Sequence, residues 1–294
     1  MTEYVQFGGE DVPNRALFLT LDYERDFGTA SPREQYEALE YTEQLVRLLE
    51  ELGVSLTCFV QTRVLEQFPE KVERLRTSDI DVSFHPHSHT HRPREETDAE
   101  YEIEKSTERY RQFFGQRPVG YRFPDGAIRD EDYEHLAAAG YRFDASIFPS
   151  WRPGSFSNVT APTMPTYLPT QDLVEIPFTV YSPSLRVPTA LSYCRVVGRP
   201  LVELLKHYPP RPTVLNIHMH DLRTPPSVRN LPLVYRSLYR RNDNGFELLE
   251  EILKSFLERG YSTSLVDIYH RHLRDRIDSN ESEPEGELKE GHEA

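Results

Sequence analysis

The stretch "IDVSFHPHSHTHRP" (Ile80–Pro93) places four histidines within seven residues, at positions 85, 87, 89 and 91. Its first half predicts a buried strand that runs straight into the histidines. The imidazoles therefore stand at the C-terminal end of a strand, the edge at which parallel β/α folds collect their functional groups. Histidines at this density either bind a metal ion or decorate a solvated loop, and the rest of the chain bears on that choice.

Strand-like and helix-like segments alternate on both sides of this stretch, which predicts parallel β/α units. We expect strands at 16–22, 55–61, 80–87, 118–126, 141–148, 174–182, 213–221 and 261–269. We expect helices at 31–53, 62–76, 98–114, 129–140, 199–208 and 244–260. In the first helix, Ser31 and Glu34 have the spacing of a capping box. A chain of 294 residues with this pattern predicts one barrel-sized α/β domain.

Composition argues against several classes of protein. The start, "MTEYVQFGGEDVPNR", has no basic region before an apolar core, and no window approaches the roughly 20 apolar residues of a membrane span. Two cysteines, Cys58 and Cys194, are too few for a disulfide framework and favour a reducing compartment. The net charge of −14 opposes phosphate backbones and anionic membranes. We expect a soluble, cytoplasmic protein without nucleic acid or membrane partners, and homo-oligomers stay open.

Two segments fall outside the alternation. Residues 278–294, "DSNESEPEGELKEGHEA", carry almost no apolar side chains and predict a disordered acidic tail, which leaves residues 1–277 as the barrel domain. Residues 149–172 are rich in proline, serine, threonine and aromatics, and we expect a long loop that shapes a substrate pocket. Trp151 in this loop is a candidate for stacking on a sugar ring, with packing as the alternative.

Ionisable side chains follow the expected strands with unusual regularity. They are Asp22, Glu24 and Asp26 after the first strand, Arg122 in "RFPDG", Asp144 in "FDAS", and His218, His220 and Asp221 in "IHMHD". Because the C-terminal ends of parallel strands meet at one edge of the fold, we predict that these groups form one active site together with the histidine stretch.

Spacing alone allows two metal-binding pairs among the four histidines. Residues four apart face the same way on a helical turn, which fits His87 with His91 and equally His85 with His89. Two histidines and one carboxylate leave positions open on a metal for water and substrate, as in catalytic zinc sites. The same donor set describes the facial triad of non-haem iron oxygenases, but that triad normally sits on a double-sheet β scaffold.

The order of the motifs resembles the polysaccharide deacetylase family, carbohydrate esterase family 4, over roughly residues 16–270. The motifs are "TLDYERD", "HSHTH" from His87 to His91, "RFPDG", "GYRFDAS" and the late strand "LNIHMHD". The resemblance implies a distorted (β/α) barrel of about seven parallel strands. It also implies a metal-dependent hydrolase that removes an acetyl group from an N-acetylated sugar. His87 and His91 are then the ligands, and His85 and His89 pack or form hydrogen bonds elsewhere.

The acidic motif departs from the common form of the family. Many members have two adjacent aspartates here, whereas this chain has Asp22-Tyr23-Glu24-Arg25-Asp26, a pattern similar to that of relatives active on small amides. The resemblance implies that Asp22 is the general base. It implies that Glu24, or as the alternative Asp26, is the carboxylate ligand of a divalent metal, usually zinc.

The remaining site residues also take their expected roles from the resemblance. His218, or as the alternative His220, would protonate the leaving amine, because an imidazole can carry a proton at working pH. Arg122 would hold Asp22 ionised through a bidentate contact, and Asp144 would support the acid histidine.

Other functions fit part of the same pattern. Within the same fold, the enzyme could hydrolyse another C–N bond, such as that of a cyclic ureide or imide, as allantoinase-like relatives do. Outside this chemistry stand the iron oxygenase and an inactive metal-binding barrel. The β/α alternation disfavours the oxygenase, and the presence of both Asp22 and His218 disfavours the inactive barrel.

Overall fold

Strand β2 (Ala16–Tyr23) lies at the centre of the fold and is buried along its whole length. Its sequence, ALFLTLDY, is almost continuously apolar, as expected for a parallel strand that is covered on both faces. Strands β3 (Leu56–Val60) and β11 (Thr213–His218) flank it and run parallel to it. The register of β2 and β11 pairs Asp22 directly with His218.

The structure, a computed structural model, describes residues 4–152, 156–241 and 243–282. The remaining strands are β1 (Val5–Gln6), β4 (Val82–Pro86), β5 (Gly120–Tyr121), β6 (Phe143–Asp144), β7 (Trp151–Arg152), β8 (Phe156–Ser157), β9 (Thr166–Leu168), β10 (Leu173–Glu175) and β12 (Ser262–Thr263). The helices are α1 (Thr42–Leu52), α2 (Thr62–Gln67), α3 (Pro69–Arg76), α4 (Ala99–Phe114), α5 (Asp132–Ala138), α6 (Leu191–Val197), α7 (Arg199–His207), α8 (Met219–Leu222), α9 (Leu233–Arg241), α10 (Gly245–Glu258) and α11 (Val266–Ser282).

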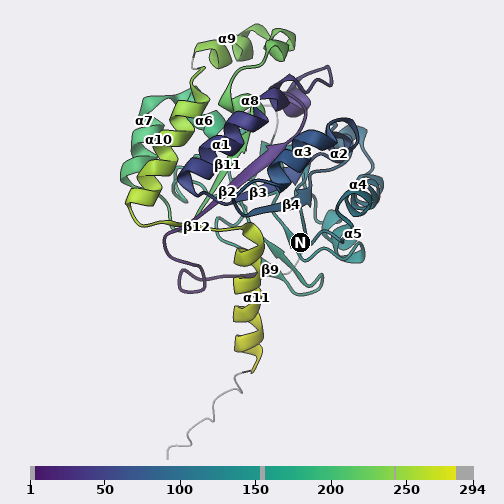
Figure 1. Cartoon of the computed structure of the whole chain (residues 1–294). Coiled ribbons are helices and arrows are strands. Elements are labelled where there is room, and N and C mark those ends of the chain that lie inside the picture. Colours follow the sequence, from purple (N-terminus) through teal and green to yellow (C-terminus); the bar gives the residue numbers. More distant parts are fainter. Residues whose placement is uncertain (1–3, 153–155, 242, 283–294) are drawn as a thin grey trace, which may run out of the picture.

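Two sheets build the barrel, and the helices lie outside them (Figure 1). One sheet has the order β11-β2-β3-β4, with β12 also paired to β2, and the other has the order β1-β9-β10-β6-β5. β5, β6 and β10 are parallel to one another, and β9 and β1 extend the second sheet in antiparallel fashion. The sheets join where the Arg122 N–H donates to the Pro86 carbonyl at 3.2 Å. The predicted distorted α/β barrel is confirmed, and its count of about seven strands stays a prediction.

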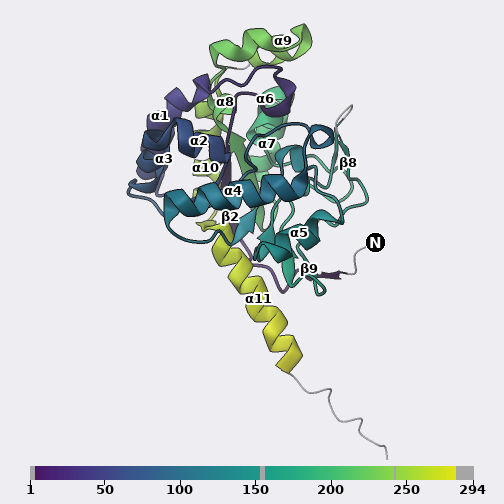
Figure 2. The same ribbon diagram turned by 90° about the vertical axis from the view of Figure 1, so that its right-hand side faces the viewer.

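The largest apolar core lies between the first sheet and helices α1, α7 and α10. Leu45 and Leu49 of α1, and Ile252 of α10, are fully buried there because they recur at helical spacing on one face. A second apolar core lies between α11 and the barrel. Helix α11 projects from the end of the molecule opposite α9 (Figures 1 and 2). None of the described helices is long and apolar enough to cross a membrane.

The predicted helix at 31–53 begins about ten residues later than expected, with a 3-10 turn at Glu37–Tyr41 followed by α1. The predicted capping box does not form. The Ser31 hydroxyl instead contacts Arg33, and the Glu34 carboxylate pairs with Arg63 at 2.5 Å. Two backbone donors at the turn, the N–H groups of Glu37 and Ala38, are satisfied by Asp26, which lies 11 and 12 residues before them in the sequence.

The C-terminal part also differs from the prediction. Only Ser262–Thr263 of the strand expected at 261–269 is extended, because Val266, Tyr269 and Leu273 have helical spacing and bury one face of α11 in the second core. Helix α11 continues through residues 278–282, the first part of the predicted disordered tail. The domain boundary at 277 stays a prediction. The rest of the predicted tail lies outside the described residues.

Gly120→Ala tests how tightly β5 and β6 are packed. A Cβ atom at this position would lie 2.0 Å from Cζ of the buried Phe143 ring, so we expect a destabilisation of about 1–3 kcal/mol. The measurement is urea unfolding, with Gly9→Ala as the matched control because nothing lies within 4 Å of its added Cβ. Equal stability of the two variants would contradict the packing described here.

Candidate metal centre and active site

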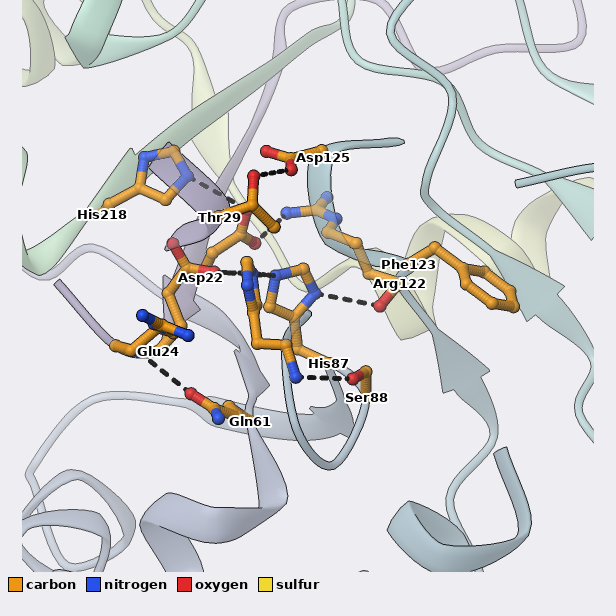
Figure 3. A network of polar contacts seen from close by, with 12 residues as sticks. Asp22, Glu24, Thr29, Gln61, His87, Ser88, Arg122, Phe123, Asp125 and His218 are labelled. Atoms are coloured by element: carbon orange, nitrogen blue, oxygen red, sulfur yellow. Dashed lines mark hydrogen bonds and ion pairs between the residues drawn. The ribbon is translucent and has the colours of Figure 1, made fainter. Parts of the chain in front are cut away.

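Glu24, His87 and His91 bring three potential metal ligands to one point. The Nε2 atoms of His87 and His91 lie 3.1 Å apart, and His87 Nε2 lies 3.1 Å from Glu24 Oε2. His91 Nε2 also contacts Glu24 Oε2. All three side chains are buried, and they come from the segment just after β2 and the loop after β4 (Figure 3).

The hydrogen bonds around this cluster fit a bound cation. His87 Nδ1 donates to the Arg122 carbonyl at 2.9 Å, so in the neutral ring Nε2 carries a lone pair. That lone pair and the Glu24 carboxylate are both acceptors at 3.1 Å, and they repel unless a proton or a cation lies between them. Burial alone would raise the pKa of Glu24, but the charge of His91 and hydrogen bonds from both histidines hold it well below the usual range.

The two histidines converge through a loop, not through the helical turn that their spacing suggested. After β4 the backbone turns twice through left-handed conformations, with φ 61° at Ser88 and φ 51° at His91. The Glu102 carboxylate of α4 holds this loop, accepting from the N–H groups of His89 and Thr90 at 2.8 Å each and from the Ser88 hydroxyl. The spacing argument, which allowed both pairs of histidines, therefore does not describe how His87 and His91 converge.

The other two histidines point away from the cluster, as predicted. His85 donates from Nε2 to Asp267 at 2.7 Å and accepts the Gly120 N–H at Nδ1. His89 contacts the Thr62 hydroxyl at 3.0 Å. Both are structural hydrogen-bonding residues in this fold.

Asp22 lies beside the cluster in a fully buried ionic environment. Its carboxylate accepts from Arg122 Nη1 at 2.6 Å and from the Asn216 amide at 3.2 Å. Burial by itself would raise the pKa of Asp22, but the Arg122 charge dominates and lowers it. The predicted bidentate contact is not formed, because the Arg122 guanidinium also donates to the carbonyl of Ala145 and to Asn216.

His218 faces Asp22 from β11, with Nε2 at 3.4 Å from Asp22 Oδ2. Its Nδ1 donates to Asp221 at 2.7 Å. Burial opposes protonation of this imidazole, but the charge of Asp221 prevails and raises the pKa of His218 well above its usual value. The side chain is 21% exposed, which leaves a route to a substrate.

Asp144 does not support His218, contrary to the prediction. Its carboxylate accepts from the backbone and hydroxyl of Ser146, and it lies opposite Glu175 in the parallel ladder of β6 and β10. Burial raises the pKa of Asp144 to about 6. The supporting role belongs to Asp221, because β11 ends at His218 and helix α8 turns Asp221 back onto it.

His220 is not suited to be the acid. The chain becomes helical after His218, so His218 and His220 do not alternate along one strand face. The Phe27 N–H donates to His220 Nδ1 at 3.1 Å, which requires an unprotonated nitrogen there. Burial lowers the pKa of His220 to about 4, so the ring is neutral at ordinary pH.

Asp26 is not among the converging ligands. Its two carboxylate oxygens accept from the N–H groups of Glu37 and Ala38 at 3.0 Å each, and the Ser227 hydroxyl donates to one of them at 2.5 Å. Asp26 therefore organises the start of the 3-10 turn before α1. The structure places Glu24, and not Asp26, beside the two histidines.

A pocket opens above these groups, with a cavity volume of about 70 Å³. Phe148, Phe178, Phe123 and Tyr193 supply its apolar walls, and Asp125 lies at the same pocket, where it accepts from Thr29 (Figure 3). The described residues of the predicted loop at 149–172 contribute none of the lining. The loop contains β7, β8 and β9 instead, and Trp151 on β7 is 59% exposed and lies outside the pocket.

Sequence reasoning missed Glu102 and Asn216 and gave Asp221 no role. Glu102 lies in an acidic helix with six other charged residues, and nothing in the pattern distinguishes it from its neighbours. Asn216 and Asp221 could have been found, because Asn216 shares a strand face with His218 and Asp221 follows it by three residues.

Solved structures of known proteins share this fold. A Mycobacterium smegmatis protein named as a candidate polysaccharide deacetylase has a TM-score of 0.58 at 15% identity, over 94% of this chain and 96% of that chain. BA3943 of Bacillus anthracis, a CE4 family pseudoenzyme, has a TM-score of 0.51 at 14% identity, over 87% and 66%. At such identities the likeness shows the fold alone.

Residues 9–143 match the model of the family described as Polysaccharide deacetylase, the family that the motifs resemble. No curated protein matches the chain.

Glu102→Ala should loosen the loop that carries both histidine ligands. The amides of His89 and Thr90 lose their acceptor, so we expect their hydrogen exchange to accelerate by at least about tenfold. The control is Glu100→Ala, on an exposed position of the same helix. Unchanged exchange at both amides would mean that Glu102 does not hold the loop.

Proposed function

We propose that this protein is a metal-dependent deacetylase that removes an acetyl group from an N-acetylated sugar. The observation that carries the proposal is the placement of a complete set of groups around one pocket. The three candidate ligands Glu24, His87 and His91 converge on its floor, and Asp22 and His218 face each other beside them.

Glu24, His87 and His91 would hold a divalent cation, and zinc fits two imidazoles and one carboxylate best. When bound, such an ion supplies Lewis acidity, which polarises an amide carbonyl and acidifies water. The hydrogen bond from His87 Nδ1 to the Arg122 carbonyl fixes the ring so that Nε2 points into the cluster.

Asp22 would act as the general base. Its contact with Arg122 keeps the carboxylate ionised over the whole working pH range, so it can accept a proton from the attacking water. The Asn216 amide, at 3.2 Å, orients one carboxylate oxygen, and the other is held by Arg122. The base is thus positioned on both oxygens before a substrate arrives.

His218 would act as the general acid that protonates the leaving amine. Its hydrogen bond to Asp221 fixes the proton on Nδ1, so Nε2 is the nitrogen that exchanges a proton with the substrate. The raised pKa keeps the imidazolium populated near neutral pH. Because β2 and β11 pair Asp22 with His218, the acid and the base approach one scissile bond from neighbouring strands.

The pocket supports a sugar-like substrate. Phe148 and Phe178 stack with centroids 3.5 Å apart and form a flat apolar wall, against which the carbon face of a pyranose ring can pack. The relative BA3943 is a pseudoenzyme, but here both the base and the acid are present and in contact. We therefore favour an active enzyme over a binding module. Zinc as the loaded metal and a cytoplasmic location stay predictions.

The test is release of acetate from N-acetylated monosaccharides and short oligosaccharides by zinc-loaded protein. A cyclic ureide serves as the comparison substrate, because a C–N hydrolase of another kind would cleave it instead. Metal content is measured on the same samples. Stoichiometric metal without acetate release from any sugar would reject the proposed substrate class.

Asp22→Asn and Glu24→Gln separate the base from the ligand. We expect Asp22→Asn to keep the metal and lose about two to four orders of magnitude in kcat, which is the usual contribution of a positioned base. Glu24→Gln should lose most of its metal, because an amide lacks the charge that holds a divalent cation. Elemental analysis checks both, and Asp26→Asn is the matched control that should retain metal. Loss of metal in Asp22→Asn but not in Glu24→Gln would reverse the two roles.

Asp221→Asn should shift the pH profile. The negative charge of Asp221 raises the pKa of His218 in the folded protein, so removing that charge lowers this pKa. The acid is then deprotonated at lower pH, and the basic limb of the kcat profile moves toward acid while the acidic limb stays in place. An unmoved basic limb would show that His218 is not the group titrating there.

A further inference from the structure

A second pocket, of about 410 Å³, lies at the opposite end of the barrel from the candidate metal ligands. Arg15 directly precedes β2, and Arg211 precedes β11 by two residues, so this pocket sits at the N-terminal ends of the strands that carry Asp22 and His218. Eight residues of β2 separate the two ends by roughly 26 Å. A ligand here would not reach the catalytic groups.

The pocket concentrates the positive charge of three arginines, and the carboxylate of Glu203 lies 3.5 Å from its lining residue His207. Arg15, Arg211 and Arg259 all line it, all are exposed, and none of them forms an ion pair with a carboxylate in the described part of the chain. Arg259 Nη2 contacts only the ring nitrogen Nδ1 of His207, at 3.5 Å. In a chain with a net charge of −14, three unpaired guanidinium groups in one concavity indicate an anion as the missing partner.

The backbone holds one of these arginines in an unfavourable conformation. Arg15 has φ 55°, in the left-handed region that costs a non-glycine residue on the order of 1 kcal/mol. The conformation is fixed because the Arg15 carbonyl accepts the Ser262 N–H at 3.0 Å. Its guanidinium approaches Gly260, next to Arg259, where an added Cβ would lie 3.9 Å from Arg15 Nη1. The fold thus brings arginines from two distant segments together.

An aromatic side chain completes the pocket. Tyr208 is 70% exposed, an unusual state for a large ring, and it lies beside His207 in the lining. The neighbouring Glu203 is engaged by Lys206 at 3.1 Å, so its charge is largely compensated. A flat exposed ring next to a cluster of guanidinium groups matches a ligand with a planar base and a polyanionic end.

We propose that this pocket binds a nucleoside diphosphate, with the diphosphate on Arg15, Arg211 and Arg259 and the base against Tyr208. Its volume is in the range of small-molecule sites, and planar guanidinium groups match phosphate oxygens in bidentate fashion. The site is separate from the deacetylase pocket, and it does not rest on the function proposed above.

Isothermal titration calorimetry of the full chain with ADP, in magnesium-free buffer of low ionic strength, tests the proposal. We expect ADP to bind with a dissociation constant below about 1 mM, inorganic pyrophosphate to bind more weakly, and adenosine not to bind measurably. Arg259→Gln and Arg15→Gln should each weaken ADP binding at least about tenfold, because each removes a charge-assisted hydrogen bond to the diphosphate. Tyr208→Ala should weaken binding of ADP but not of pyrophosphate.

Two controls make the outcome decisive. Arg47→Gln removes an exposed arginine that pairs with Glu43 elsewhere on the surface, and it should leave ADP binding unchanged. His87→Ala should also leave it unchanged, because the metal centre is at the other end of the barrel. Absence of ADP binding at millimolar concentration, an equal loss in Arg47→Gln, or a loss in His87→Ala would each overturn the proposal. Thermal unfolding of the Arg15, Arg211 and Arg259 variants verifies that they fold, and Arg211→Gln replaces either of the others if it does not.

Discussion

Arg122 contacts the proposed base Asp22, the candidate metal ligand His87 and the junction of the two sheets. Its guanidinium is buried between the rings of Phe59 and Phe178, 3.8 and 4.3 Å from their centroids, and donates to Asp22 at 2.6 Å. The backbone of Arg122 makes two further hydrogen bonds. Its N–H donates to the Pro86 carbonyl and joins the two sheets, and its carbonyl accepts from His87 Nδ1 and orients that ring. A buried guanidinium is costly to desolvate, and here the ion pair with Asp22 and the hydrogen bonds from Nε to Ala145 and from Nη1 to Thr20 and Asn216 offset that cost.

The three buried carboxylates near Arg122 differ in how readily they ionise, because they differ in their distance from its charge. Asp22 is close enough to the guanidinium to stay ionised, whereas Asp144 and Glu175 share a dry space behind it and cannot both carry charge. The raised pKa of Glu175 reflects this, since burial and the neighbouring Asp144 both oppose its ionisation. The positive charge of Arg122 is thereby left mainly to Asp22, which is the carboxylate beside the metal centre.

Much of this arrangement was accessible from the sequence, and the errors have identifiable causes. The strands and the ionisable groups at their ends were predicted because the hydrophobic pattern of a strand, and the position of a residue at its end, can be read from the local sequence. Three features were not predicted: the role of Asp26, the partner of His218 and the start of α1. Each depends on a contact between residues that no local sequence pattern brings together. Asp26 is occupied by Glu37 and Ala38, and α8 brings Asp221 back to His218 where Asp144 had been expected.

Asp22 and His218 are register partners in the ladder of β2 and β11, so backbone hydrogen bonds fix the distance between these two residues. In a parallel sheet the spacing of neighbouring strands is nearly invariant, whereas the loops beyond the strand ends are free in length and sequence. The separation of the proposed acid and base is therefore set by the sheet and does not depend on the residues of the pocket walls. A fold built in this way can exchange one substrate for another by altering Phe148, Tyr193 or their loops, while its proton-transfer geometry stays constant.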